Sequence, residues 1–204
     1  MLIGIDFGLT PAAVVGQFSE GQLVVFKEYT ETNMGAERFM LMLTQKLKLD
    51  FPHYTDFKKN WLCFVDPSGF FRKDTDEGTC ALEVGKYFNP LPGPVAWEAR
   101  RKSVAEFLVK LELGEPAFMI YARECPVLFK GFEGGYRFAD KSFEIEPNRV
   151  RPVKDHFSHP HDALQYLCSG VNDTVIKLHK TVPKPEYSFN QKGSNYGKAA
   201  QSNG

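Results

Sequence analysis

The chain has 204 residues, of which 43% are hydrophobic and 14% aromatic, which is enough for one domain with a full core and excludes a disordered chain. Its 25 Lys and Arg balance 25 Asp and Glu, so no overall field gathers polyanions and any nucleic-acid binding must be local. No apolar run approaches the roughly 18 residues that span a bilayer, and no basic leader precedes the first strand pattern, so we expect a soluble, cytoplasmic protein.

Three strand-like runs open the chain, at residues 2–7, 12–18 and 22–29, and the turns between them are short enough for an antiparallel meander. Residues 34–49 repeat apolar side chains at three-to-four spacing, which predicts a helix, and a further apolar strand is expected at 61–65. A helix between two strands favours a parallel crossover, so we expect a mixed sheet.

The second half of the chain is richer in helical patterns. The expected elements are helices at 75–88 and 97–113 around a loop at 89–94, a strand at 117–121, a helical turn at 125–132, a hairpin at 131–143 and a last helix from about 158 to 170. Ser158 is expected to cap that last helix, in which the small residues Ala163 and Gly170 would allow close approach to a sheet. We expect one domain at residues 1–180 and a flexible tail at 181–204.

The four cysteines lie far apart along the chain and form no C-x-x-C pair, so neither a zinc clip nor a disulfide framework is indicated. We expect Cys63, Cys80, Cys125 and Cys168 to be reduced and mostly buried as small hydrophobic side chains. The chemistry of the chain must therefore rest on other residues.

Three aspartates stand where an acid is conspicuous: Asp6 within an apolar strand, Asp66 at the end of another, and Asp162 near the start of the last helix. A carboxylate in an apolar strand costs several kcal/mol unless it is paired or holds a cation. A shared divalent metal is the simplest common reason for all three.

Two of these aspartates also have a structural interpretation. Asp66 opens an Asp-Pro-Ser-Gly sequence that suits a type I turn, and Asp162 in a first helical turn is favoured by the helix dipole whatever its function. Turn chemistry does not require an acid between Ile5 and Phe7, so Asp6 is the hardest to explain in this way. Separate structural explanations for all three acids together are much less favoured than such an explanation for any one of them.

Polar residues beside Asp162 are further candidates. His159 lies three residues before it, close enough on a helix to reach the same ion, and is open between metal ligand and structural histidine. His161 should point away from that stripe and is expected to be structural. Lys154 and Asp155 precede the helix as a phosphate contact or a spare ligand, although solvated loop residues are the favoured interpretation.

Two basic clusters are candidates for a local contact with nucleic acid. They are residues 100–102, and Arg149 and Arg151 together with Lys154. Such clusters are more often solvated surface, so we give them little weight.

The order of the elements sharpens the prediction. A three-strand meander, a crossover helix, a fourth strand and a late helix, with acids on the first strand, at the end of the fourth and on the final helix, is the layout of RNase H-like nucleases. We therefore expect an RNase H-like α/β fold with a mixed sheet of five or more strands, three antiparallel and then parallel, flanked by helices. In that layout Asp6 and Asp66 lie on neighbouring strands and face one site that Asp162 closes.

Clustered carboxylates suit the hard, oxygen-seeking ions Mg²⁺ and Mn²⁺. Two such ions can activate a water molecule and stabilise the leaving oxygen of a phosphodiester. We expect Asp6, Asp66 and Asp162 to be the catalytic metal ligands, with Asp6 bridging the two ions and His159 as a candidate fourth ligand.

At these residues the sequence resembles the C-terminal nuclease domain of the large terminase subunit of tailed bacteriophages. The similar segments are residues 3–8, 65–69 and 154–166, with residues 100–104 and 125–135 as connecting pieces. The His-x-x-Asp-Ala-Leu run that begins at His159 is the most specific part, and the resemblance covers roughly residues 1–170.

The resemblance implies a metal-dependent endonuclease that cuts double-stranded, concatemeric viral DNA in the host cytoplasm when a head is filled. It carries the metal-ligand role onto Asp6, Asp66 and Asp162, with His159 as a candidate fourth. The implied partners are a packaging ATPase domain of the same full-length protein, a portal and a small terminase subunit. The sequence has no G-x-x-x-x-G-K-[ST] motif, so we expect an isolated nuclease domain to which ATP is irrelevant.

Three alternatives stay open. Residues 6–10 also resemble the first phosphate loop of actin-like sugar kinases and ATPases, which need a second lobe that about 180 ordered residues cannot supply. A non-catalytic module that docks onto a portal or DNA would keep the acids as surface features. A resolvase-like junction nuclease would share the chemistry and prefer branched DNA.

Overall fold

A six-stranded mixed sheet forms the centre of the computed structural model, which describes residues 1–8, 10–71, 79–138 and 151–181. The strand order is β5-β4-β1-β2-β3-β8. The antiparallel strands are β1 (Leu2–Asp6), β2 (Ala12–Ser19) and β3 (Gln22–Thr30); those added in parallel are β4 (Leu62–Val65), β5 (Pro90–Pro92) and β8 (Phe118–Ile120). The mixed sheet predicted from the sequence is confirmed.

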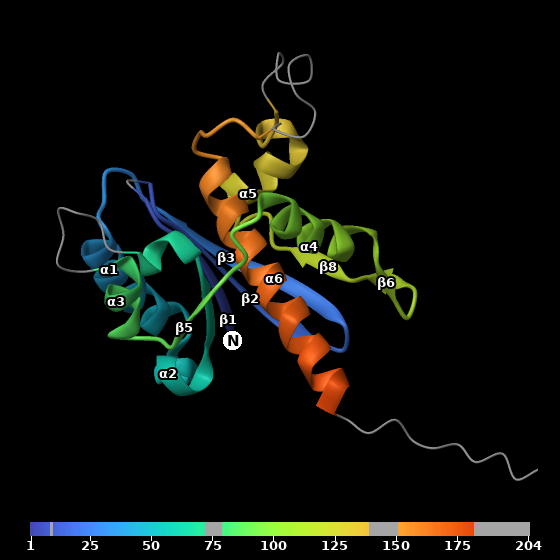
Figure 1. Cartoon of the computed structure of the whole chain (residues 1–204), viewed down its shortest axis with the longest axis horizontal. Helices are drawn as coiled ribbons and strands as arrows, with labels where there is room; N and C mark the ends of the chain where they lie inside the picture. Colours follow the sequence, from blue (N-terminus) through green and yellow to red (C-terminus); the bar gives the residue numbers. More distant parts are fainter. Residues whose placement is uncertain (9, 72–78, 139–150, 182–204) are drawn as a thin grey trace, which may run out of the picture.

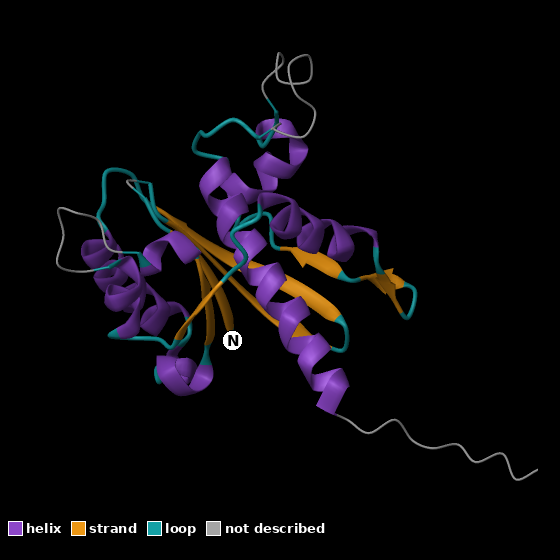
Figure 2. Ribbon diagram, viewed as in Figure 1, coloured by secondary structure: helices purple, strands orange, loops and turns teal. Residues whose placement is uncertain are grey.

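Helices cover both faces of this sheet, and Figure 2 shows the strands between the two helical layers. The first layer contains α1 (Ala36–Asp50), α2 (Phe57–Asn60) and α3 (Cys80–Gly85), and the second contains α4 (Trp97–Val109), α5 (Pro126–Lys130) and α6 (Ser158–Thr181) (Figure 1). Short helical turns lie at η1 (Pro52–Tyr54), η2 (Pro67–Phe70) and η3 (Gly131–Gly135, a π-helical turn). Each layer encloses its own apolar core.

The two-residue period of β1 divides its side chains between these cores. Ile3 and Ile5 are fully buried against the first layer, whereas Leu2 belongs to the core under α6. Gly4 lies under Ala163 of α6, on the same face as Leu2. Asp6, two residues further along, therefore faces the α6 side of the sheet.

Helix α6 lies directly on the sheet. A Cβ atom added at Gly4 would overlap the backbone carbonyl of Ala163, and one added at Gly170 would overlap the ring of Phe64 on β4. The close approach expected from Ala163 and Gly170 is confirmed, and Gly4 supplies the matching gap on the strand.

Several boundaries differ from those expected. The expected helix at 97–113 ends at Val109 because a small hairpin follows, with β6 (Leu111–Glu112) and β7 (Glu115–Pro116) joined at Leu113 and Gly114, which have φ angles of 51° and 89°. The last helix continues past residue 170 to Thr181. Within the range expected to be helical at 75–88, α3 begins at Cys80, and residues 75–78 lie outside the described residues.

The loop expected at 89–94 contains strand β5. Pro90 and Pro92 belong to an edge strand, where proline is tolerated because its missing N–H removes no ladder bond on the open side. The hairpin expected at 131–143 begins instead as the π-helical turn η3, and its residues 139–143 lie outside the described residues, as does nearly all of the expected tail.

Cys63, Cys125 and Cys168 are buried and Cys80 is half-buried, in line with the expected burial. None of the described helices combines the length and the apolar character that crossing a bilayer requires.

We predict that Gly4→Ala lowers the free energy of unfolding by about 1–3 kcal/mol, because the added methyl group forces α6 away from β1. Urea denaturation followed by circular dichroism measures the change. Gly85→Ala is the matched control: a Cβ there meets nothing within 4 Å, so a neutral or slightly stabilising effect is expected. Equal stability of the two variants would contradict the close packing of α6.

Candidate active site

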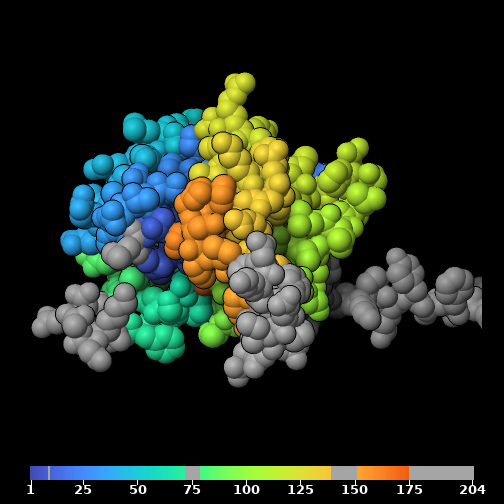
Figure 3. Space-filling model, turned by 90° about the horizontal axis from the view of Figure 1, so that it is seen from above, coloured from blue at the N-terminus to red at the C-terminus, as the bar shows by residue number. Residues whose placement is uncertain are grey.

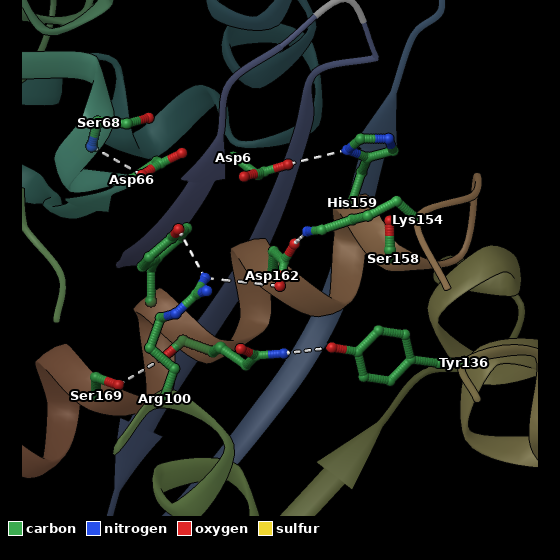
Figure 4. A network of polar contacts seen from close by, with 12 residues as sticks. Asp6, Asp66, Ser68, Arg100, Tyr136, Lys154, Ser158, His159, Asp162 and Ser169 are labelled. Atoms are coloured by element: carbon green, nitrogen blue, oxygen red, sulfur yellow. Dashed lines mark hydrogen bonds and ion pairs between the residues drawn. The ribbon is translucent and has the colours of Figure 1, made fainter. Parts of the chain in front are cut away.

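The three aspartates singled out in the sequence line one pocket of about 240 Å³. Asp6 ends β1 and Asp66 directly follows β4, and the parallel register pairs Ile5 with Val65, so both acids leave the sheet at equivalent positions on neighbouring strands. Asp162 faces them from the beginning of α6 (Figure 4). Residues from three distant parts of the chain are thus brought together as predicted.

Asp6 is buried, with 8% of its side chain exposed, and its Oδ2 lies 3.0 Å from His159 Nδ1. Burial raises the pKa of Asp6 to about 6; the hydrogen bond with His159 acts in the opposite direction, and the charges of Asp162 and Asp66 raise it further. Viewed from above, the first strand and the start of α6 lie side by side at the surface (Figure 3). His159, on α6, therefore contacts Asp6, on the sheet.

Asp66 combines the two interpretations that its sequence allowed. Its Oδ1 accepts a hydrogen bond from the backbone N–H of Ser68 at 2.9 Å, which caps the short helix η2. The same residue lines the pocket with Asp6 and Asp162. Turn chemistry holds this carboxylate at the mouth of the site, so the structural role also positions the side chain.

Asp162 is the most enclosed of the three acids, with 3% of its side chain exposed. The Lys154 ammonium group donates a hydrogen bond to Oδ2, and Arg100 Nη1 lies 3.6 Å from Oδ1. Oδ1 itself is buried and receives no hydrogen bond within the described part of the chain. Two cations thus neighbour one carboxylate, and one of its oxygens is left without a donor.

Arg100 is a site residue that the sequence did not single out from its basic cluster. Its Nη1 donates to the hydroxyl of Tyr166 at 2.7 Å, and its guanidinium group lies 4.9 Å from the centre of that ring. Tyr166 follows Asp162 by one turn on α6 and lines the same pocket. The helical spacing of Asp162 and Tyr166 was visible in the sequence, but the placement of Arg100 on α4 against them was not.

The two basic clusters, which are far apart in the sequence, converge on this site. Arg100 and Lys154, one from each cluster, approach the same carboxylate of Asp162. Farther out, Arg101 and Arg151 both lie against the ring of Trp97, at 5.6 Å and 5.0 Å from its centre. Arg149 lies outside the described residues. Lys154 is an exposed loop residue, as expected, and its ammonium group also forms an ion pair with a buried acid, which the sequence did not predict.

His161 and Asp155 both make local contacts around the start of α6. The ring of His161 stacks on Tyr136 at 4.4 Å with an interplanar angle of 6°, and burial lowers the pKa of His161 to about 4. Asp155 Oδ1 accepts the N–H of Phe157, and the hydroxyl of Ser158 donates to the carbonyl oxygen of Asp155. The side-chain acceptor before α6 is therefore Asp155, where Ser158 was expected.

The chemical type of the acidic side chains in the pocket suits a hard divalent ion. Asp6, Asp66 and Asp162 supply oxygen ligands to one pocket, and the buried Oδ1 of Asp162 lacks a hydrogen-bond donor. Across the described ranges, however, no three His, Cys, Asp or Glu side chains converge closely enough to enclose an ion. The cations that neighbour Asp162 in this structure are the side chains of Lys154 and Arg100.

Comparison with known proteins locates the fold but gives no match in sequence. No protein-family model matches the chain, and no curated protein matches it. Among solved structures, the large terminase of the thermophilic bacteriophage D6E superimposes on 84% of this chain with a TM-score of 0.61 and 17% identity. The nuclease domain of the P22 large terminase matches 84% of the chain and 80% of its own length, with a TM-score of 0.55 and 12% identity.

A third similar structure, the large-terminase nuclease of the thermophilic phage G20c with bound cobalt, covers 82% of this chain at a TM-score of 0.50 and 14% identity. The chain spans 39% of the length of the D6E protein but most of the two nuclease domains. The chain therefore has the RNase H-like fold of large-terminase nuclease domains, as its sequence motifs predicted.

Substitutions of two of the acids should have opposite effects on stability. Asp6 has a folded-state pKa of about 6, above its ordinary value of 3.8, so ionisation destabilises the fold as pH rises between these values. Asp6→Asn should therefore raise the free energy of unfolding at pH 8 by about 1–3 kcal/mol, and the gain should disappear near pH 4. Urea denaturation in EDTA at both pH values measures this.

Asp162→Asn is expected to lower the free energy of unfolding by about 1–3 kcal/mol under the same conditions, because Lys154 and Arg100 lose their common partner. A loss of stability in both variants, or a gain in both, would contradict the electrostatic difference between these two acids.

Proposed function

We propose that this chain is a Mg²⁺- or Mn²⁺-dependent endonuclease that cleaves double-stranded, concatemeric viral DNA during genome packaging by two-metal-ion hydrolysis. One observation carries the proposal: three acids, from β1, the end of β4 and α6, line a single pocket in a fold shared with large-terminase nuclease domains. The fold is supported by the similar structures, and the proposed chemistry is supported by the residues of that pocket.

Each pocket residue has a distinct role in this proposal. Asp6, Asp66 and Asp162 would hold the metal, and His159 would orient Asp6 or serve as a fourth ligand. When bound, two such ions supply an activated water molecule and stabilise the leaving oxygen of the phosphodiester. The burial of Asp6 and Asp162 favours ion binding, since a divalent ion relieves the repulsion between enclosed carboxylates.

Arg100 and Lys154 would bind the phosphate backbone of DNA at the pocket. Arg100 is held by Tyr166, so its fork of N–H donors is pre-oriented, whereas Lys154 reaches in from solvent. These contacts carry no base readout, because arginine and lysine on phosphates position DNA without reading sequence. Little sequence preference is therefore part of the proposal.

The chain would act as one part of a larger machine. The D6E large terminase, of which the chain spans 39%, has been solved with ADP and with ATP-gamma-S. By analogy we place a packaging ATPase domain in the same full-length protein, with a portal and a small terminase subunit as further partners in the host cytoplasm. The motor would then hold the DNA that this domain cuts.

The direct test is incubation of supercoiled plasmid with the 204-residue chain in Mg²⁺, Mn²⁺ or EDTA. We expect nicking and linearisation only with metal and without need of ATP. Asp6→Asn, Asp66→Asn and Asp162→Asn should each reduce the rate at least about a hundredfold, and His159→Ala should have a milder effect if the imidazole only orients Asp6. The matched control is Asp56→Asn, an exposed cap of α2 remote from the pocket, which should cut at the wild-type rate.

Several experimental outcomes would contradict the proposal. Cleavage that survives EDTA excludes metal dependence, and metal-stimulated ATP hydrolysis by the chain would favour the actin-like alternative. DNA binding without cleavage would favour a docking module, and cutting of branched in preference to linear DNA would favour a junction nuclease.

DNA binding by this domain alone should be weak and steeply salt-dependent. The net charge is zero, so affinity rests on a few local phosphate contacts at Arg100, Lys154 and their neighbours. Fluorescence anisotropy in Ca²⁺ from 50 to about 200 mM salt should show an affinity loss of at least about tenfold. Tight binding that salt does not change would contradict the proposed interface.

A further inference from the structure

The Lys154 ammonium group lies at a position in the pocket where the proposed metal ion would also bind. Its ammonium group donates to Oδ2 of Asp162, one of the three pocket acids, and it comes from the segment just before α6. Figure 4 shows the lysine reaching past the start of α6 toward this carboxylate, between Asp162 and the contact of Asp6 with His159. A protein cation therefore lies on an oxygen that the proposed function assigns to a metal.

The two cations near Asp162 differ in how firmly they are held. Arg100 has 13% of its side chain exposed and is fixed by the hydrogen bond to Tyr166 and by contact with that ring. Lys154 has 65% of its side chain exposed. Withdrawing Lys154 returns an ammonium group to water at little cost, whereas withdrawing Arg100 would break a packed contact.

The backbone around Lys154 is anchored on both sides. The N–H of Val153 donates to the carbonyl of Arg137 at 2.9 Å, and Asp155 makes the hydrogen bonds that start α6. Exchange of Lys154 therefore needs only rotation of its long side chain. The ammonium group would remain near the mouth of the pocket after leaving Asp162.

The acids of the pocket need a positive charge whether or not metal is present. Asp162 is 3% exposed and Asp6 8%, and Asp66 lines the same pocket, so repulsion among them favours any cation that fits. An ammonium group supplies one charge through a single contact, and a divalent ion supplies two through several oxygens. A divalent ion at this site would compete with Lys154 for Oδ2 of Asp162.

We propose that Lys154 is an exchangeable counter-ion, which neutralises Asp162 in the metal-free protein and gives up that carboxylate when a divalent cation binds. The displaced ammonium group then faces the phosphate of DNA, a last step that rests on the proposed nuclease function. Lys154 is in this sense a positioning residue that couples metal binding to DNA binding.

Calorimetric titration of the full chain with Mn²⁺ tests the exchange, and electron paramagnetic resonance of free Mn²⁺ provides an independent readout. Lys154→Gln should bind the first Mn²⁺ about tenfold more tightly, which corresponds to about 1.4 kcal/mol. Lys154→Arg, which keeps a cation within reach of Asp162, should bind as wild type does. Lys102→Gln is the surface control: this lysine is 76% exposed, pairs with Glu106 and lies outside the pocket, so Mn²⁺ affinity should not change.

Thermal unfolding adds a second readout, and its measurement in EDTA does not depend on metal affinity. In EDTA, Lys154→Gln should melt below wild type because Asp162 loses its counter-ion, and saturating Mn²⁺ should raise the melting temperature more in the variant than in wild type. In an Asp162→Asn background, Lys154→Gln should leave Mn²⁺ affinity unchanged, since the contested oxygen is gone.

Unchanged or weaker Mn²⁺ binding by Lys154→Gln would overturn the exchange, as would a wild-type chain that binds no Mn²⁺. Failure of the proposed function is distinguishable. If Lys154→Gln binds Mn²⁺ tenfold more tightly but the wild-type chain never cuts DNA, the counter-ion proposal is supported and the nuclease proposal is refuted. If the wild-type chain cuts DNA but Lys154→Gln binds Mn²⁺ no more tightly, the nuclease proposal is supported and the counter-ion proposal is refuted. If both hold, Lys154→Gln should also raise the KM for DNA at saturating Mn²⁺.

Discussion

The direct contact of α6 with β1 is the constraint on which the pocket depends. Gly4 has no side chain, so the backbone of Ala163 can lie on the strand, and Asp162 is the residue next to it. The same approach brings His159, one turn earlier on the helix, to within 3.0 Å of Asp6. The pocket is therefore positioned by packing between regular elements, which hold side chains more rigidly than loops do.

Electrostatic contacts then stabilise the three acids that this packing brings together. Enclosed carboxylates are unfavourable alone, and the chain balances them with groups drawn from elsewhere: His159 on Asp6, a backbone N–H on Asp66, and Lys154 with Arg100 on Asp162. Each acid thus has a different kind of partner. A set of identical side chains is in this way divided into three environments with different charges and different access to solvent.

The sequence predicted the sheet and the three acids because their signals are local: alternating apolar runs, short turns and an acid where none is otherwise needed. It did not predict strand β5, because Pro90 and Pro92 remove the strand signal and only tertiary pairing with β4 reveals it. The position of Arg100 and the ion pair of Lys154 were missed for a related reason. Arg100 lies some 60 residues before Asp162 in the sequence and Lys154 lies 8 residues before it, and no helix or strand periodicity links either of them to that acid.

The parallel pairing of β1 with β4 also makes the pocket sensitive to residue count. Ile5 lies beside Val65, so Asp6 and Asp66 leave the sheet together and on the same face. Side chains alternate along a strand, so one residue gained or lost within β1 would direct its acid into the apolar core under α1 and turn an isoleucine toward α6. Single-residue insertions and deletions inside these two short strands are therefore forbidden by parity, even where the added residue itself would suit a strand.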